Sequence, residues 1–227
     1  TRPLTGQQIG KFYSHPVWIL NGIFTSTDAD SAQHRCAIAG QLKLFGVRSV
    51  ADYGGGFGAL AHQIRAAIPN CQVDIVDPFT SYFGFAAERS DENIRFRSNL
   101  RGPYDCVVAQ DVLEHVENPI ELASSLVSAT RTGGYLVFAN CFYPVVKCHL
   151  PRTFYLRHTF GYIMQAYGLR ALGAVSGAPH ALIFRREEAI APDDAVWRQT
   201  LARIVGPLLN ASNTLLDRIK RALPTKR

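Results

Sequence analysis

Short apolar segments alternate with helical ones through the middle of this sequence. Strand-like runs rich in valine, isoleucine and aromatic residues recur from residue 47 to residue 187, and most are followed by apolar residues at helical spacing. Such alternation builds βαβ units, whose strands form a parallel sheet covered by helices on both faces. The seven expected strands are residues 47–53, 71–78, 93–99, 104–110, 133–140, 169–177 and 180–187.

The last two expected strands are joined by the short turn SGAP. That connection is too short for a crossover helix, so the sheet should end in an antiparallel pair. We therefore expect an α/β fold with a doubly wound, mostly parallel seven-stranded sheet whose last strand is antiparallel. Residues 1–46 are expected to form a helical lead-in or lid, residues 47–187 the central domain, and residues 188–227 a helical extension broken at Gly206-Pro207.

The N-terminal region carries helix signals. Thr27 or Asp28 can cap a helix that stops at Gly46. The aromatic segment before it, residues 12–24 with His15 and Trp18, is expected to be irregular or a short helix that could cover a site. Another helix is expected at residues 81–89.

A glycine-rich loop follows the first expected strand. Glycines at this place allow unusual backbone angles and close approach of a ligand, at the edge where open α/β sheets bind ligands. Asp77 ends the second strand, where a carboxylate can accept both hydroxyls of a ribose. Together they predict a cofactor that contains adenosine. The loop comprises Asp52, Gly54, Gly55, Gly56 and Gly58.

Two cofactors compete for this loop. Gly54-x-Gly56-x-x-Ala59 satisfies the pattern for a nicotinamide dinucleotide, with Asp77 at about 20 residues' distance. Asp52 favours S-adenosylmethionine instead, because a carboxylate repels a pyrophosphate but attracts an ammonium and a sulfonium. An NAD-dependent oxidoreductase remains an alternative at this point.

Polar residues follow the fourth expected strand in YDCVVAQDVLEHVENP. With VADYGGGFG, VDIVDP and TGGYLVFAN in the same order, the sequence resembles the class I (Rossmann-like) S-adenosylmethionine-dependent methyltransferases over about residues 47–187. The resemblance implies the seven-stranded sheet and S-adenosylmethionine as cofactor. The sequence departs from the family at Asn99, where many members have an acid that bonds the adenine. The cofactor-binding residues that the resemblance implies are Asp52, Gly54, Gly55, Gly56, Gly58, Asp77, Pro78, Phe79, Asn99, Gln110 and Asp111.

Methyl transfer depends mainly on proximity and orientation, and a hydroxyl acceptor can also require a base. His115 is the first candidate base, because it follows the fourth strand where acceptor and methyl group must meet. His149 and His158 are further candidates, in the segment that commonly covers the substrate in this family. The expected reaction is O-methylation of a small molecule, a sugar or a lipid-linked glycan, hence a role in glycan biosynthesis. Aromatic residues that favour a sugar are Tyr143, Phe154, Tyr155, Phe160 and Tyr162.

The same region offers a metal alternative. Asp111, Glu114, His115 and His158 resemble the metal site of small-RNA 2′-O-methyltransferases, and two carboxylates with two imidazoles can hold Mg²⁺ or another divalent ion. A metal-assisted RNA methyltransferase is therefore an alternative. We expect no metal, since the DVLEH pattern also occurs in members that work without one.

Charge is concentrated at the end of the chain. The net charge is +6, and the residues after Leu215 hold five basic side chains against one acidic, a net charge of +4. Because this tail also has an apolar face, we expect peripheral contact with an anionic membrane, or a packing or homodimer helix. Nucleic acid is an unlikely partner, because the basic residues lie away from the expected site. Five cysteines without a CxxC pair favour free thiols and a cytoplasmic protein at the inner face of a membrane.

Overall fold

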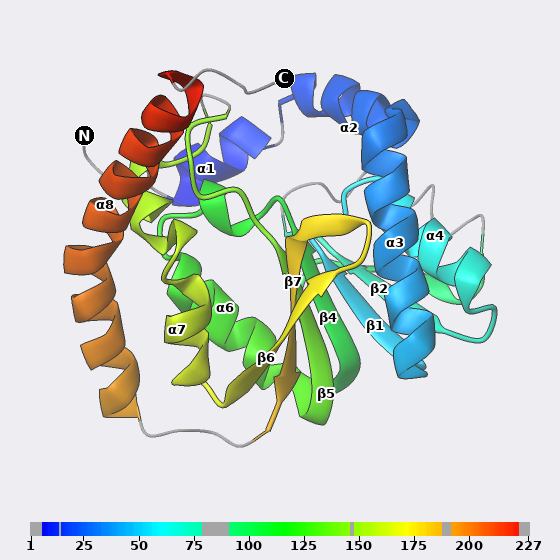
Figure 1. Ribbon diagram of the computed structural model, residues 1–227. Coiled ribbons are helices and arrows are strands. Elements are labelled where there is room, and N and C mark those ends of the chain that lie inside the picture. Colours follow the sequence, from blue (N-terminus) through cyan, green and yellow to red (C-terminus); the bar gives the residue numbers. More distant parts are fainter. Residues whose placement is uncertain (1–5, 14, 79–90, 146–147, 188–191, 223–227) are drawn as a thin grey trace, which may run out of the picture.

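The structure is a computed structural model that describes residues 6–13, 15–78, 91–145, 148–187 and 192–222, with side chains on α8 described as far as Asn213. The described residues form one seven-stranded sheet in the order β3-β2-β1-β4-β5-β7-β6 (Figure 1). The strands are β1 Ser49–Tyr53, β2 Gln72–Val76, β3 Ile94–Arg97, β4 Tyr104–Gln110, β5 Thr130–Ala139, β6 Leu169–Val175 and β7 Ala178–Arg186.

The pairing of the strands confirms the predicted topology. β1 pairs in parallel with both β2 and β4, and β4 pairs in parallel with β5. β7 is antiparallel to β5 and to β6. The turn between β6 and β7 is tight enough to need Gly177 at φ 87°, which leaves no room for a crossover helix.

Helices cover both faces of the sheet (Figure 1). α3 and α4 pack on one face around Ile38, Leu42 and Ile64, and α6 and α7 pack on the other. α8 lies outside α7 and contacts the 3-10 segment η2. The bounds are α1 Gly6–Tyr13, α2 Val17–Thr27, α3 Ala29–Phe45, α4 Ala59–Ala67, η1 Leu113–His115, α6 Pro119–Ser128, η2 Pro151–Arg157, α7 Phe160–Gln165 and α8 Pro192–Ala222.

The signals at the ends of α3 act as expected. The side chain of Asp28 accepts a hydrogen bond from the backbone N–H of Ser31 at 2.8 Å, and Gly46 ends the helix at φ 66°. Although we grouped α3 with the N-terminal extension, it contributes Ile38 and Leu42 to the core of the sheet. The helix expected at residues 81–89 lies outside the described residues.

The expected break in the C-terminal extension is wrong. α8 continues through Gly206 and Pro207 as one helix of 31 residues. A Cβ at position 206 would lie 2.3 Å from the backbone oxygen of Tyr155, so this glycine allows α8 to pack closely on η2. The Asn210 side chain also donates to the Phe154 oxygen at 2.8 Å. These tertiary contacts outweigh the local helix-breaking tendency of the Gly-Pro pair.

Two further features can be checked directly. All five cysteines are free thiols, as predicted. In the part of the chain that the structure describes, each helix is too short or too polar to pass through a bilayer.

Candidate active site

The glycine loop lies where β1 turns into α4, at the carboxyl edge of the parallel strands. Gly54, Gly56 and Gly58 have φ of 75°, 48° and 76°, backbone angles that favour glycine. A Cβ at position 54 would lie 2.5 Å from Val112, whereas one at position 56 would meet no atom within 4 Å. The loop therefore follows a path that requires glycine and leaves space above Gly56 for a ligand.

Asp52 is a buried acid without a partner in the described residues. Its side chain is 2% exposed, and Oδ2 has no hydrogen-bond partner. A Cβ at position 55 would lie 2.4 Å from this oxygen, so Gly55 lets the carboxylate reach the loop. Burial, with the charge of Asp77, raises the pKa of Asp52 to about 7, although Arg35 acts in the opposite direction. An orphaned carboxylate oxygen in this position fits a bound cation such as an ammonium.

A cavity of about 310 Å³ opens beside this loop. Its lining includes Tyr13 from α1 and Trp18 from α2, which we call its aromatic roof, and the glycine loop. Asp111 lines it with φ 54° and donates its backbone N–H to the oxygen of Ala139 at 2.7 Å. The predicted site residues that the structure brings together in this cavity are Asp52, Gly54, Gly55, Gly56, Asp77, Pro78, Gln110, Asp111 and His115.

Arg35 is a cavity residue that sequence reasoning missed. It comes from α3, is buried, and donates through Nη2 to the Thr25 oxygen at 2.7 Å. Burial lowers its pKa and the Asp52 carboxylate raises it. The sequence could have indicated that Arg35 is buried. It lies three residues before Ile38 and seven before Leu42, on the core-facing side of an expected helix. A buried arginine needs an anionic or carbonyl partner.

The aromatic segment that we expected to cover a site contains short helices. The segment comprises the end of α1 at Tyr13 and α2 from Val17, and Trp18 lines the cavity while its indole donates to the Phe12 oxygen at 2.8 Å. His15 points elsewhere, since it is exposed and accepts from the Val17 N–H at 3.2 Å.

The expected adenine contacts do not assemble from the described residues. Asn99 is exposed and donates to the Ser98 hydroxyl at 3.3 Å, outside the lining of the cavity. It follows the edge strand β3, whose end lies far across the sheet from β4. Phe79 lies outside the described residues. Gly58 caps α4 and stands behind the loop.

His115 and His149 lie together, and His115 lines the cavity. Their ring centroids are 4.9 Å apart, and His149 is buried behind His115. Nδ1 of His115 is 3.2 Å from the Cys148 oxygen, and Nδ1 of His149 is 2.8 Å from the Tyr143 oxygen. Because a carbonyl oxygen only accepts, each Nδ1 carries the proton and each Nε2 keeps its lone pair. Burial is the main cause that lowers the pKa of His115 and keeps its ring neutral.

Glu114 lies next to this histidine pair. It is fully buried, and Oε1 accepts the backbone N–H of Cys141 at 2.7 Å while Oε2 has no hydrogen-bond partner. Burial raises the pKa of Glu114 to about 7. One ligand atom each from Glu114, His115 and His149 lies within 4.8 Å of the others.

This cluster corrects the predicted set around DVLEH. His158 is exposed, and its Nε2 is 2.8 Å from the side-chain nitrogen of Asn213 on α8. The physical reason is that η2 carries the chain away from the cavity and under α8, so His149 takes the position expected of His158. Asp111 is exposed at the cavity and stands apart from the cluster.

The aromatic segment after Asn140 also differs from its predicted role. Phe160 is buried against Phe138 and Phe142, so it belongs to the core. Tyr155 and Tyr162 lie under the guanidinium groups of Arg203 and Arg198 from α8. These two rings therefore contact α8, and neither lines the cavity beside the glycine loop.

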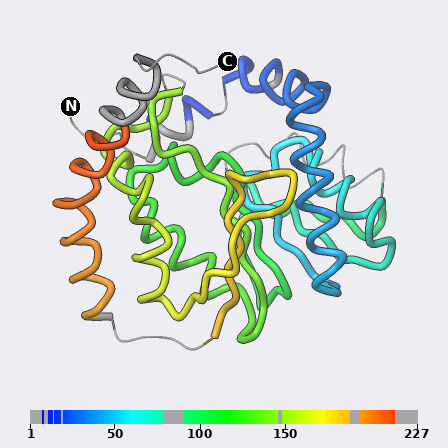
Figure 2. The backbone as a smooth tube through the Cα atoms, viewed as in Figure 1, coloured from blue at the N-terminus to red at the C-terminus, as the bar shows by residue number. Residues whose placement is uncertain are grey.

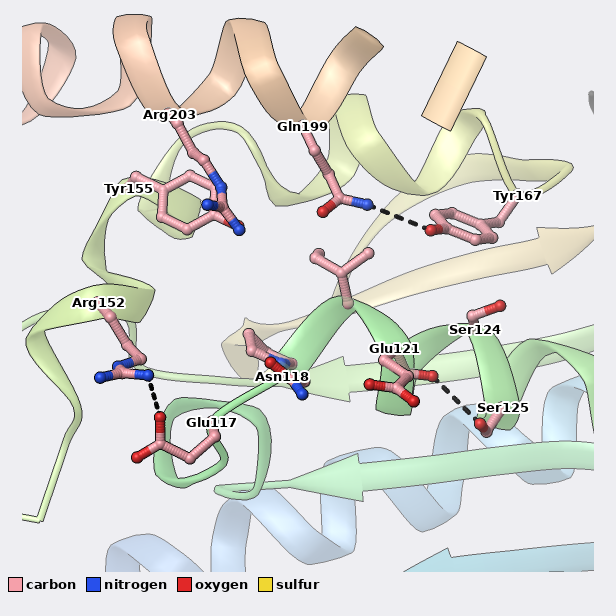
Figure 3. Close-up of a pocket in the computed structure, with 12 residues that line it drawn as sticks. Glu117, Asn118, Glu121, Ser124, Ser125, Arg152, Tyr155, Tyr167, Gln199 and Arg203 are labelled. Atoms are coloured by element: carbon pink, nitrogen blue, oxygen red, sulfur yellow. Dashed lines mark hydrogen bonds and ion pairs between the residues drawn. The ribbon is translucent and has the colours of Figure 1, made fainter. Parts of the chain in front are cut away.

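A larger groove of about 800 Å³ lies between α6, η2 and α8 (Figure 3). Arg152 forms an ion pair with Glu117, and Gln199 donates to the Tyr167 hydroxyl at 3.3 Å. Its lining contains none of the predicted catalytic or cofactor-binding residues, although it includes Tyr155 from the expected aromatic cover. The smaller cavity at the carboxyl edge has the buried acids and the glycine loop, so we assign the chemistry to it despite its size.

The family of the chain follows from comparison with known proteins. A family model described as a methyltransferase domain matches residues 31–172, which is more than half of the chain. The chain therefore belongs to this methyltransferase family, and the prediction of a class I methyltransferase that uses S-adenosylmethionine is confirmed. The match decides in favour of S-adenosylmethionine where the glycine loop alone left NAD open.

Solved structures share the fold. The mitomycin 7-O-methyltransferase MmcR superposes with a TM-score of 0.59 at 14% identity, covering 78% of this chain and 60% of its own. Human N-acetylserotonin methyltransferase in complex with SAM gives 0.52 at 18% identity, with coverage of 81% and 57%. The plantazolicin methyltransferase BpumL, bound to a pentazolic desmethylPZN analog and SAH, gives 0.55 at 13% identity, with coverage of 75% and 79%.

The chain thus spans about three fifths of the length of MmcR and of the human enzyme. A search of curated proteins found no match.

Proposed function

We propose that this methyltransferase methylates an oxygen atom of a small organic acceptor, with His115 as the base. The observation that carries the proposal is that His115 lines the same cavity as Asp52 and the glycine loop, with Nδ1 fixed on a backbone oxygen and Nε2 left as an acceptor. The burial that lowers the pKa of His115 keeps it neutral near pH 7, which is the form a base needs.

The residues present fit S-adenosylmethionine, which supplies an electrophilic methyl group on a sulfonium when bound. The orphaned Oδ2 of Asp52 would hold the ammonium, and the buried guanidinium of Arg35 would hold the carboxylate of the same amino-acid end. Asp77, at the end of β2, would accept the ribose hydroxyls. Tyr13 and Trp18 cover the cavity and would exclude water from it.

His115 would take the proton of the acceptor hydroxyl at Nε2. Its Nδ1–H stays on the Cys148 oxygen, so the ring keeps its orientation while it gains positive charge. The carboxylate of Asp111 favours that charge, because it acts to raise the pKa of His115. The residues thus provide orientation and proton transfer, which are the two contributions that O-methylation requires from a protein.

A hydroxyl on a small molecule, a sugar or a lipid-linked glycan is the acceptor class we favour. The aromatic faces available for a sugar or aryl ring are Tyr13 and Trp18 in the roof. An RNA acceptor is less favoured, because Arg35 is the only arginine or lysine among the described residues of the cavity and RNA binding needs many phosphate contacts.

The test is a transfer assay with radiolabelled S-adenosylmethionine against phenols, sugars and lipid-linked glycans. Label should appear on a hydroxyl of one class, and His115→Gln should abolish it while calorimetry still detects cofactor binding. Unchanged turnover in His115→Gln, or label only on nitrogen or carbon, would contradict the proposal.

A second candidate is metal-assisted transfer, which the unpartnered Oε2 of Glu114 favours. Glu114, His115 and His149 each bring one ligand atom to within 4.8 Å of the others, and two imidazoles favour Zn²⁺ or Mn²⁺ over Mg²⁺. Calorimetry with each ion should show one site that His149→Gln removes and that the matched control His158→Gln retains. Equal binding by both variants, or no binding by the wild type, excludes this candidate.

A further inference from the structure

The outward face of α2 is apolar and exposed. Leu20, Ile23 and Phe24 are 68%, 53% and 63% exposed, and Val17 on the same face is half-exposed. None of the 11 residues Val17–Thr27 is charged. A surface helix ordinarily carries charged residues on its outer face, and one that is apolar on all sides is ordinarily buried.

The inward face of α2 fixes this orientation. Trp18 and Thr25 line the cofactor cavity. A Cβ at Gly22 would lie 2.0 Å from the Phe57 ring, so α2 is packed tightly on the glycine loop. The helix cannot turn its apolar outer face inward without losing these contacts, and the exposed row is therefore a property of the packed structure.

A second apolar row lies on α8. Trp197, Ile204 and Leu208, at spacings of seven and four residues, are each about 60% exposed, while Ala195 and Ala202 face the domain. Figure 2 shows the described part of α8 running toward the end of the molecule at which α2 lies. The helix continues to Ala222, and the sequence after Leu215 has a net charge of +4.

We propose that α2 and the C-terminal part of α8 dock on the surface of an anionic bilayer. An uncharged apolar face lies at the end of the molecule toward which α8 and its basic sequence run, and this combination matches the two layers of such a surface, its acyl boundary and its anionic headgroups. A second copy of the chain is less suited to this position, because it would bring one basic segment toward another. Docking in this position would let a lipid-linked acceptor reach the cavity from the bilayer. That consequence rests on the proposed function, whereas the docking itself does not.

The experiment is flotation of the full chain with vesicles of phosphatidylcholine and phosphatidylglycerol in equal parts, and with vesicles of phosphatidylcholine alone. We expect binding to the mixed vesicles, weaker binding to the neutral ones, and weakening by salt. Leu20→Gln with Phe24→Gln should lower the partition coefficient about tenfold or more. The matched control is Leu44→Gln, because Leu44 is 81% exposed near the end of α3, which runs to the opposite end of the sheet (Figure 1).

Replacement of Arg218, Lys220 and Arg221 by glutamine should remove the preference for anionic vesicles. Absence of flotation by the wild type, or equal flotation of the α2 variant and the Leu44→Gln control, overturns the proposal. Sedimentation equilibrium of the same variants decides the competing case. A dimer that the α2 substitutions dissociate, without vesicle binding, would assign the face to a second copy. Calorimetry with S-adenosylmethionine in the absence of vesicles tests the proposed function separately.

Discussion

Asp52 and Glu114 are two buried carboxyl groups near the cofactor cavity: Asp52 lines the cavity, and Glu114 lies next to His115, which lines it too. Each has one oxygen without a hydrogen-bond partner, and burial raises the pKa of each to about 7. Their neighbours differ, because Asp52 lies near the cationic Arg35 while Glu114 lies beside two imidazoles. Although both are buried, we expect Asp52 to bind a cationic group of the ligand and Glu114 to bind a proton or a metal ion.

The comparison shows that burial alone does not give a carboxylate its role. On the donor side, Asp52 and the glycine loop belong to one strand-loop-helix unit, and the ligand completes their electrostatics. On the acceptor side, Glu114 and His115 belong to η1, but His149 arrives from the segment after β5. Substitutions on each side should consequently separate cofactor binding from catalysis.

The largest expected effect is on the acceptor side. His115→Gln should lower kcat for a hydroxyl acceptor roughly a hundredfold to ten-thousandfold, because the transfer loses its base. The dissociation constant of S-adenosylmethionine should stay within about twofold. Steady-state kinetics with calorimetry measure both quantities. His158→Gln is the control and should change neither; a loss of activity in it would mean that the acceptor side extends to η2.

The next effect concerns the free energy of unfolding, which Glu114 lowers when its buried carboxyl group ionises. Because its pKa is raised in the folded state, from 4.5 to about 7, the folded protein binds this proton more tightly than the unfolded chain. Stability should then fall as pH rises from about 4.5 to 7, by up to about 3 kcal/mol. Glu114→Gln should lack this loss. Denaturant unfolding with a chelator present should therefore show a smaller fall in the free energy of unfolding from pH 5 to pH 8 for the variant than for the wild type. An equal change in both proteins would show that Glu114 is ionised in the folded state.

On the donor side, Asp52→Asn should weaken the binding of S-adenosylmethionine about tenfold to a hundredfold, by removing a charge-assisted hydrogen bond. Calorimetry measures the loss. Asn99→Ala should leave affinity unchanged, since Asn99 is exposed outside the cavity. If Asn99→Ala weakened binding as much as Asp52→Asn does, the adenine would lie farther toward β3 than the cavity indicates.

The smallest effect is a pH dependence. If Asp52 holds the ammonium, the binding of S-adenosylmethionine must release the proton of the Asp52 carboxyl group at any pH below the Asp52 pKa of about 7. Affinity for S-adenosylmethionine should then fall about tenfold for each pH unit below 7 and level off above it. Titrations in buffers of different ionisation enthalpy would detect the released proton. A flat profile in the wild type, or the same slope in Asp52→Asn, would assign the ammonium to another group.

Much of the fold could be predicted because local patterns and the sheet agree. The seven strands, the antiparallel end of the sheet and the caps of α3 each depend on residues close together in the chain. The prediction failed at Gly206-Pro207, where a local helix-breaking pair lies within a continuous helix. There the contact with Tyr155, far away in sequence, outweighs the local tendency.

The site divides in the same way. The sequence alone was enough to predict that Asp52, the glycines and Asp77 lie together, because they stand at the ends of consecutive strands, and the ends of parallel strands must meet at one edge of the sheet. Only the tertiary structure decided that His149 and not His158 joins His115, that Arg35 faces Asp52, and that Tyr155 and Tyr162 support α8. These choices depend on how loops and helices pack across the sheet, and packing between distant segments has no period or spacing that a sequence displays.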